Sequence, residues 1–109
     1  MERLLHCVMD IGEQMLCSGA EVHRVEESVE RMCRAFGARR VDVFIITSSM
    51  VVTVFTDSDS YTQTRRITSS GTDFERLHHL NALCRRICTV PMTEAEIRDA
   101  LARIDGVKS

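Results

Sequence analysis

Two adjacent arginines, Arg65 and Arg66, lie in a segment rich in threonine and serine that is typical of a β-strand. Side chains alternate between the two faces of a strand, so one guanidinium points towards the interior and the other towards water. A buried guanidinium needs a carboxylate partner. We predict that Glu26 provides this partner for the inward arginine in a structural ion pair; the alternative is a guanidinium fork that holds the carboxylate of a small ligand.

Thiols, hydroxyls and imidazoles are the groups from which a hydrolase would be built. Cys17 or Ser49 would be the nucleophile and His23 the base, provided that they lie within hydrogen-bonding distance. Cys7 with His6 is a further combination. No local sequence motif marks any of these residues as a reactive pair. A small hydrolase is therefore the alternative to a non-catalytic protein.

The cysteines form neither a disulfide framework nor a metal-binding motif. Five occur, an odd number without a Cys-x-x-Cys spacing, at Cys7, Cys17, Cys33, Cys84 and Cys88. We predict reduced thiols, with Cys84 and Cys88 in the core. His78 and His79 are neighbours, so on a helix they point about 100° apart and do not share a metal ion. The sequence predicts no cofactor and no metal site.

The chain has 109 residues, of which 14 are basic and 16 acidic, for a net charge of −2. This length fits a single domain, 1–109. The charge balance and the scarcity of aromatic residues argue against a nucleic-acid-binding protein. No apolar run approaches the roughly 20 residues of a membrane span, and Asp10 and Glu13 interrupt the start before a signal peptide can form. We therefore expect a cytosolic domain.

Apolar residues spaced three to four apart predict two helices at the start of the chain. The first ends at Ser18-Gly19, and the second runs from Val22 to Phe36 and ends at Gly37. The residues that follow predict three strands, at 41–48, 51–56 and 61–68, with a hairpin connection at 48–50.

The helical spacing returns at Phe74, with Thr72 or Asp73 as the N-cap. A last helix starts at Thr93, which forms a capping box with Glu96, and runs to residue 106. The predicted fold class is α+β: two N-terminal helices, a small three-stranded antiparallel sheet, and two C-terminal helices packed on one sheet face.

Several of these segments also resemble a known family. The run from Ile11 to Glu26, the helix end at Phe36-Gly37, the segment from Ser48 to Val52 and the triplet Thr64-Arg65-Arg66 are similar, in order and spacing, to the N-terminal domain of the threonine/serine exporter family. The most specific pieces are Ser18-Gly19-Ala20 followed by Arg24-Val25-Glu26, and the arginine triplet. The resemblance covers nearly the whole chain.

The resemblance implies a cytosolic domain that precedes a bundle of transmembrane helices, which exports threonine and serine or, in some relatives, dicarboxylates. We accordingly expect a non-catalytic domain of a bacterial amino-acid exporter, acting in assembly, gating or substrate sensing at the inner face of the membrane. The implied partners are transmembrane helices of the same or another chain, a second copy, and a small amino acid or dicarboxylate. Relatives are also described as carrying hydrolase-like residues.

If the domain senses substrate, the candidate ligand-binding residues are Arg24, Glu26, Ser49 and Arg65. The arginines would take a carboxylate and the glutamate an ammonium group. In the family the chain enters the membrane near the position of Ser109, so we expect either an excised domain or a stand-alone version. A plain interaction module with an exposed apolar patch is a further alternative.

Overall fold

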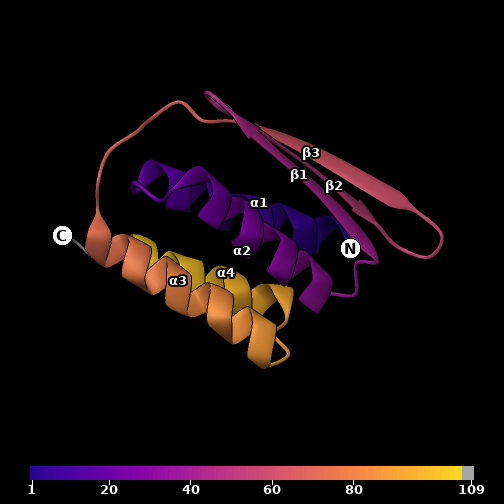
Figure 1. Ribbon diagram of the computed structural model, residues 1–109. Helices are drawn as coiled ribbons and strands as arrows, with labels where there is room; N and C mark the ends of the chain where they lie inside the picture. Colours follow the sequence, from indigo (N-terminus) through magenta and orange to yellow (C-terminus); the bar gives the residue numbers. More distant parts are fainter. Residues whose placement is uncertain (107–109) are drawn as a thin grey trace.

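The computed structural model describes residues 1–106. Over this range the chain forms helices α1 (Glu2–Cys17) and α2 (Val22–Ala35), strands β1 (Arg40–Ile46), β2 (Ser49–Phe55) and β3 (Ser60–Arg66), and helices α3 (Phe74–Thr89) and α4 (Glu94–Asp105) (Figure 1). This order of elements confirms the predicted α+β class.

The three strands form one antiparallel sheet in the order β1-β2-β3, so β2 is central and the other two strands are edges. Val52 in β2 pairs with Val43 of β1 and with Gln63 of β3. Residues on β2 alternate strictly between buried and half-buried, as expected for a sheet with one covered and one open face.

The hairpin between β1 and β2 is shorter than predicted. Thr47 and Ser48 alone connect the strands, and Ser48 has a φ of 65°. Ser49 and Met50, which we placed in the connection, belong to β2 and pair with both neighbouring strands. The Met50 side chain is fully buried, so packing against the helices extends the strand to this position.

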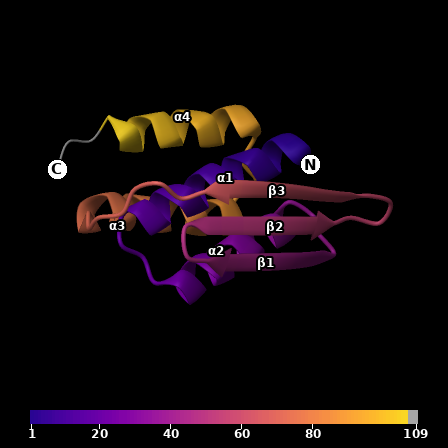
Figure 2. The same cartoon turned by 90° about the horizontal axis from the view of Figure 1, so that it is seen from above.

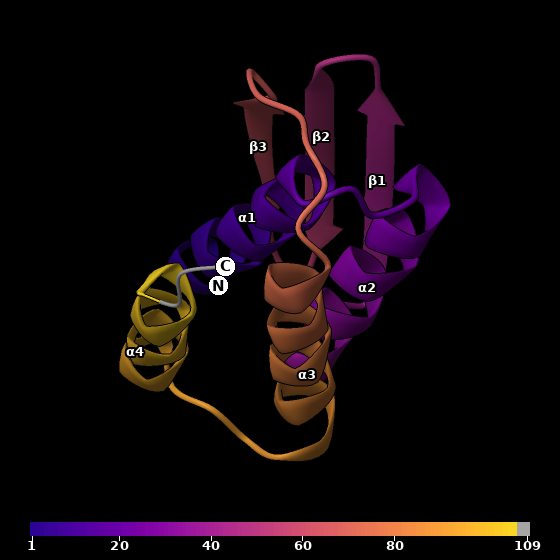
Figure 3. The same cartoon turned by 90° about the vertical axis from the view of Figure 1, so that its left-hand side faces the viewer.

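The molecule has three layers (Figures 1 and 3). The first layer is the sheet, and the second consists of α1, which lies against β3 and β2, and α2, which lies against β1. Helices α3 and α4 form the third layer and pack on α1 and α2. The C-terminal helices therefore lie on the predicted side of the sheet but one layer further away. A three-stranded sheet is only about 14 Å wide, and two helices of about 10 Å diameter already cover it.

The core lies between the sheet and the first two helices. Met50, Val52 and Val54 of β2 point into it and are fully buried. A Cβ atom on Gly12 of α1 would lie 3.2 Å from the Met50 sulfur and 3.2 Å from a Val29 methyl group of α2. The absence of a side chain at Gly12 thus allows α1 to approach β2 and α2 at the same time.

The predicted helix ends are confirmed. Gly19, with a φ of +97°, ends α1, and Gly37, with a φ of +100°, follows α2. The Asp73 carboxylate caps α3 by accepting from the Arg76 backbone N–H at 3.0 Å. At α4 both hydrogen bonds of the capping box form: the Thr93 side chain accepts from the Glu96 backbone N–H, and the Glu96 side chain accepts from the Thr93 backbone N–H. Seen from above the sheet, α4 lies beyond β3 and α2 lies near β1 (Figure 2).

Candidate functional site

Arg65 lies on the helix-facing side of β3 and reaches α1. Its Nη1 donates to Asp10 Oδ1 at 2.7 Å and to Glu13 Oε1 at 2.9 Å. Its Nη2 donates to the His6 carbonyl oxygen at 3.5 Å. The Arg65 side chain is only 18% exposed, so its charge requires the nearby carboxylates. The prediction of one inward, ion-paired arginine is confirmed for Arg65, and Arg66 is exposed.

Helix α4 joins the same contact through Arg98. Arg98 Nη1 donates to Asp10 Oδ2 at 2.9 Å, so one carboxylate binds cations from β3 and from α4. Burial by itself would lower the pKa of Arg65, but hydrogen bonds to Glu13 and Asp10 hold that pKa above its usual value. The hydrogen bond to Asp10 also raises the pKa of Arg98. We call these four residues (Arg65, Asp10, Glu13 and Arg98) the ion cluster; it fixes β3 and α4 to α1.

A cleft of about 320 Å³ lies beside the ion cluster. It is lined by residues of α1 and α4: Asp10, Glu13, Gln14, Arg98, Leu101, Ala102 and Asp105. Arg76 of α3 donates to Gln14 Oε1 at 3.2 Å and to Asp105 Oδ1 at 2.8 Å. Every charged side chain of the lining thus has a partner of opposite sign. The cleft offers no free charge to a ligand.

The prediction that Glu26 pairs with the inward arginine is wrong. Strand β3 lies over α1, whereas α2, which carries Glu26, lies under β1 at the opposite edge of the sheet (Figure 3). The partners of Arg65 therefore come from α1. The sequence held a signal for them, because His6, Asp10 and Glu13 recur every three to four residues along one flank of the helix.

The four predicted ligand-binding residues lie in different places. Arg65 belongs to the ion cluster, and Glu26 lines a groove between α2 and β1. Ser49 is the first residue of β2 and faces away from the helices, since its neighbour Met50 is buried beneath the sheet. Arg24 is exposed near the start of α2. Within residues 1–106 no hydrogen bond or ion pair joins any two of the four.

The groups proposed for a hydrolase are not paired in the part of the chain that the structure describes. The Cys17 sulfur accepts a hydrogen bond from the Ser69 hydroxyl at 3.4 Å. His23 Nε2 lies 3.7 Å from the Glu21 carboxylate. No hydrogen bond among residues 1–106 connects His23 to Cys17 or to Ser49, so neither of these two predicted nucleophile–base contacts is formed.

The third helix confirms one cysteine prediction and corrects another. Cys84 is buried as predicted, but Cys88 is exposed. Residues four apart on a helix differ by about 40° in direction, which moves Cys88 away from the inward face.

His78 and His79 contact each other edge to face, with ring centroids 5.6 Å apart. Among residues 1–106 no three His, Cys, Asp or Glu side chains form a group that could hold a metal ion.

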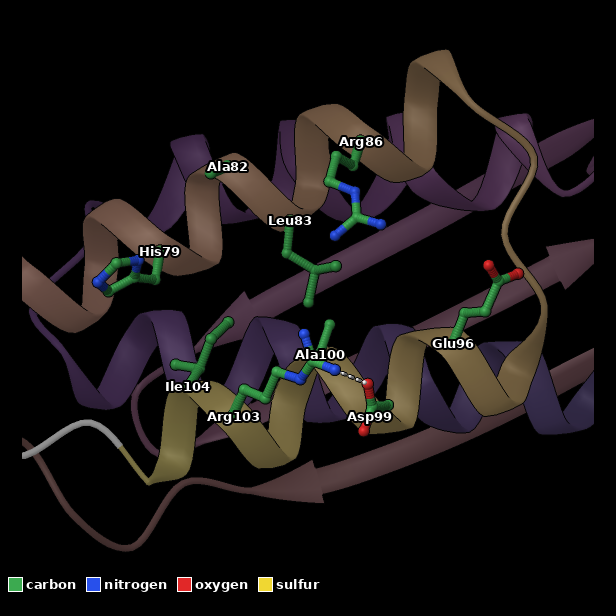
Figure 4. A pocket seen from close by; sticks show the side chains of 9 residues that line it. All are labelled: His79, Ala82, Leu83, Arg86, Glu96, Asp99, Ala100, Arg103 and Ile104. Atoms are coloured by element: carbon green, nitrogen blue, oxygen red, sulfur yellow. Dashed lines mark ion pairs between the residues drawn. The ribbon is translucent and has the colours of Figure 1, made fainter.

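A groove of about 420 Å³ lies between α3 and α4 (Figure 4). Its lining combines charged and apolar side chains: His79, Ala82, Leu83, Arg86, Glu96, Asp99, Ala100, Arg103 and Ile104. Arg103 pairs with Asp99 at 3.0 Å, and Glu96 Oε1 accepts from the Thr93 backbone N–H at 2.9 Å. Arg86 points from α3 towards α4 and forms no ion pair with residues 1–106. An exposed guanidinium of this kind can bind a carboxylate only weakly, because water competes for it.

The face of the sheet that points away from the helices, here called the outer face, is not covered by any element of residues 1–106 (Figures 1 and 3). Its side chains are Arg40, Asp42, Phe44 and Ile46 of β1, Ser49, Val51, Thr53 and Phe55 of β2, and Ser60, Thr62, Thr64 and Arg66 of β3. Phe44 is 62% exposed and Ile46 is 57% exposed. Large apolar side chains on an open face are typical of an interaction surface.

A second groove lies on the β1 side of the sheet, and Glu26 is among the residues that line it. This groove, here called the acidic groove, has a volume of about 530 Å³ and lies between α2 and β1. It is lined by Glu26, Glu27 and Glu30 of α2 and by Val41, Asp42 and Val43 of β1. Its α2 wall carries the carboxylates of Glu26, Glu27 and Glu30, whereas the Asp42 side chain lies on the outer face of the sheet. The α2 wall therefore favours a cationic partner.

The structure is thus a small α+β fold with an internal ion cluster and with exposed apolar side chains, Phe44 and Ile46, on the open face of its sheet. None of the helices in residues 1–106 is long and apolar enough to cross a membrane. The model of the family described as "Putative threonine/serine exporter" matches residues 6–109. The chain belongs to this family, which confirms the resemblance. No curated protein and no solved structure matches it.

Proposed function

We propose that this chain is the cytoplasmic, non-catalytic domain of a threonine/serine exporter and that it acts in assembly with the membrane-spanning part. The observation that carries this proposal is the uncovered outer face with Phe44 and Ile46 next to each other along β1. Because the chain belongs to the exporter family, we take the partner to be the membrane-spanning part of an exporter. The two side chains gain apolar burial only if a partner covers them.

The composition of the outer face supports contact with another protein surface. Phe44 and Ile46 on β1 and Val51 on β2, which pairs with Phe44, form an apolar patch. Asp42 and Thr53 separate this patch from Phe55, whose ring lies 5.1 Å from the Arg40 guanidinium. Threonine, serine and arginine side chains of β3 form a polar half of the face. An apolar centre beside a polar rim is the usual anatomy of a protein interface. Truncation of a few apolar side chains then removes most of the binding energy.

The test uses the exporter as the cell makes it, this chain together with its membrane-spanning part. We expect the double variant Phe44→Thr/Ile46→Thr to weaken assembly by about tenfold or more, a loss of about 1.4 kcal/mol of assembly free energy, and to lower the rate of threonine export as the assembled fraction falls. Threonine preserves the preference of β1 for a strand while removing the apolar surface. The measurement is efflux of labelled threonine from loaded cells.

The matched control is Thr64→Ser, which changes a side chain on the polar half of the same outer face. We expect export at the unsubstituted rate. Circular dichroism and thermal unfolding of each variant chain establish that the domain still folds. If the folded double variant exports threonine as fast as the control, assembly through the outer face is refuted.

A further inference from the structure

Strand β1 has a second open feature, its free edge. The strand pairs with β2 on one side only, and no other strand of residues 1–106 pairs with its other side, beneath which α2 passes (Figure 2). Along an antiparallel strand, alternate residues direct their N–H and C=O groups to each side. Over the seven residues of β1, the groups on the outer side are available to pair with a further strand.

The acidic groove runs along this edge, between Val41–Val43 of β1 and the flank of α2. Glu27 and Glu30 form ion pairs with Arg31 and Arg34 of the same helix at 2.6 and 3.0 Å. Asp42 pairs with Arg40 at 3.2 Å.

All three of these ion pairs are largely exposed, so they contribute little and exchange readily with another cation. Glu26 forms no ion pair with residues 1–106. It is therefore the carboxylate of the acidic groove that is free to receive a new positive charge.

We propose that the edge of β1 binds an extended, basic protein segment as a fourth strand of the sheet, with its Lys or Arg side chains against Glu26 and the neighbouring carboxylates. Addition of a strand to a sheet edge is a common mode of peptide recognition, in which backbone hydrogen bonds give affinity and side chains give specificity. Here the edge of β1 would supply the backbone hydrogen bonds, and the acidic groove would supply the side-chain specificity.

This inference rests on the proposed function, because it names the partner that meets β1. Cytoplasmic segments that flank transmembrane helices are enriched in Lys and Arg. Such a segment of the exporter has the charge that the acidic groove favours, and Phe44 and Ile46 project from the same strand to cover its apolar side chains. A second copy is disfavoured at this edge, since pairing two β1 strands would bring two acidic grooves together.

The test is a titration of the 109-residue chain with a synthetic nine-residue peptide of alternating lysine and valine, followed by amide chemical shifts. We expect shift changes along Val41–Ile45 and in α2 around Glu26, and an affinity that falls as salt is raised. Glu26→Gln should weaken binding by about fivefold. The matched control Glu75→Gln, an exposed carboxylate on α3, should leave the affinity unchanged.

Four results would overturn the inference. One is equal binding of a peptide of alternating glutamate and valine, which would exclude charge selection. Another is shift changes confined to β3 or to the groove between α3 and α4. The third is concentration-dependent dimerisation through β1 with no effect of the basic peptide, which would assign the edge to a second copy. Absence of binding at millimolar peptide also refutes it.

The outcome is independent of the export experiment. If the peptide fails to bind and the Phe44/Ile46 variant still loses export, assembly through the outer face stands and the strand-addition inference fails. If the basic peptide binds along β1 and the Phe44/Ile46 variant exports normally, the edge is a binding site and the proposed role of the outer face fails.

Discussion

The positively charged side chain of Arg65 lies in a part of the molecule where water solvates it only weakly. Its two carboxylate partners, Asp10 and Glu13, are 28% and 31% exposed, so they also depend on the arginine. Removing one partner of a buried pair costs more than the pair contributes, because the remaining charges lose their compensation. The residual exposure and the second cation on Asp10, from Arg98, reduce this cost but do not abolish it.

We therefore expect Arg65→Met to lower the free energy of unfolding by about 2–3 kcal/mol, below the 3–5 kcal/mol of a fully buried pair. The matched control is Arg66→Met, the next residue on the outer face, which should change stability by less than about 0.5 kcal/mol. Urea unfolding of both variants gives the comparison. Equal stability of the two variants would show that the ion cluster contributes nothing.

That one of the two arginines faces inward was predictable from the sequence, but which one and with which partners was not. Alternation along a strand is a local rule, so it places Arg65 and Arg66 on opposite faces whatever the rest of the fold does. Which carboxylate meets the inward arginine depends on which helix lies under β3. That is a property of the three-dimensional packing, and the choice of Glu26 assumed α2 where the structure has α1.

Among the elements, α4 has the most explicit start signal. Thr93 accepts from the Glu96 N–H at 3.2 Å, and Glu96 accepts from the Thr93 N–H at 2.9 Å. Hydrogen bonds from the backbone and side chain of Thr93 lower the pKa of Glu96 below its ordinary value of 4.5. A lowered pKa in the folded state means that the ionised glutamate stabilises the fold above the unfolded pKa and that this contribution disappears as pH falls through the folded pKa.

We expect Thr93→Ala to destabilise the domain by about 1 kcal/mol at neutral pH, the usual cost of losing an N-cap. Glu96→Gln keeps the hydrogen-bonding partner of the capping box but does not titrate. Its unfolding free energy should therefore fall less than that of the unsubstituted chain as pH is lowered from 5 to 3. Parallel acid dependence of the two proteins, measured by urea unfolding, would refute the role of Glu96 ionisation.

Element ends with a local cause were predictable, and those set by packing were not. The glycines after α1 and α2 and the capping box of α4 act through the backbone within one turn. The start of β2 was placed too late because burial of Met50, a tertiary contact, extends the strand. The third layer was missed for a related reason, since helical periodicity shows that a face is apolar but not which neighbour covers it.

Three of the cysteines lie in the core of the molecule, one on each of three helices. Cys7 of α1, Cys33 of α2 and Cys84 of α3 are buried, whereas Cys88 is exposed and Cys17 is half-buried. Burial raises the pKa of Cys33 to about 12 and that of Cys84 to about 11, from an ordinary value of 9.0. Burial raises the pKa of Cys7 as well. Because the thiolate is the reactive form, these three thiols are protected both by packing and by protonation.

At pH 8 we expect a thiol reagent to modify two cysteines, Cys17 and Cys88, rapidly and the other three only through unfolding. The three protected thiols should become reactive together as urea is raised, since a domain of this size unfolds as one unit. Cys7 tests the attachment of α4, whose Arg98 and Glu94 lie near it. Labelling of Cys7 before Cys33 and Cys84 would show that α4 detaches separately and that the ion cluster fails to hold it. The control Cys88→Ser should lower the rapid count from two to one and leave the slow phase unchanged.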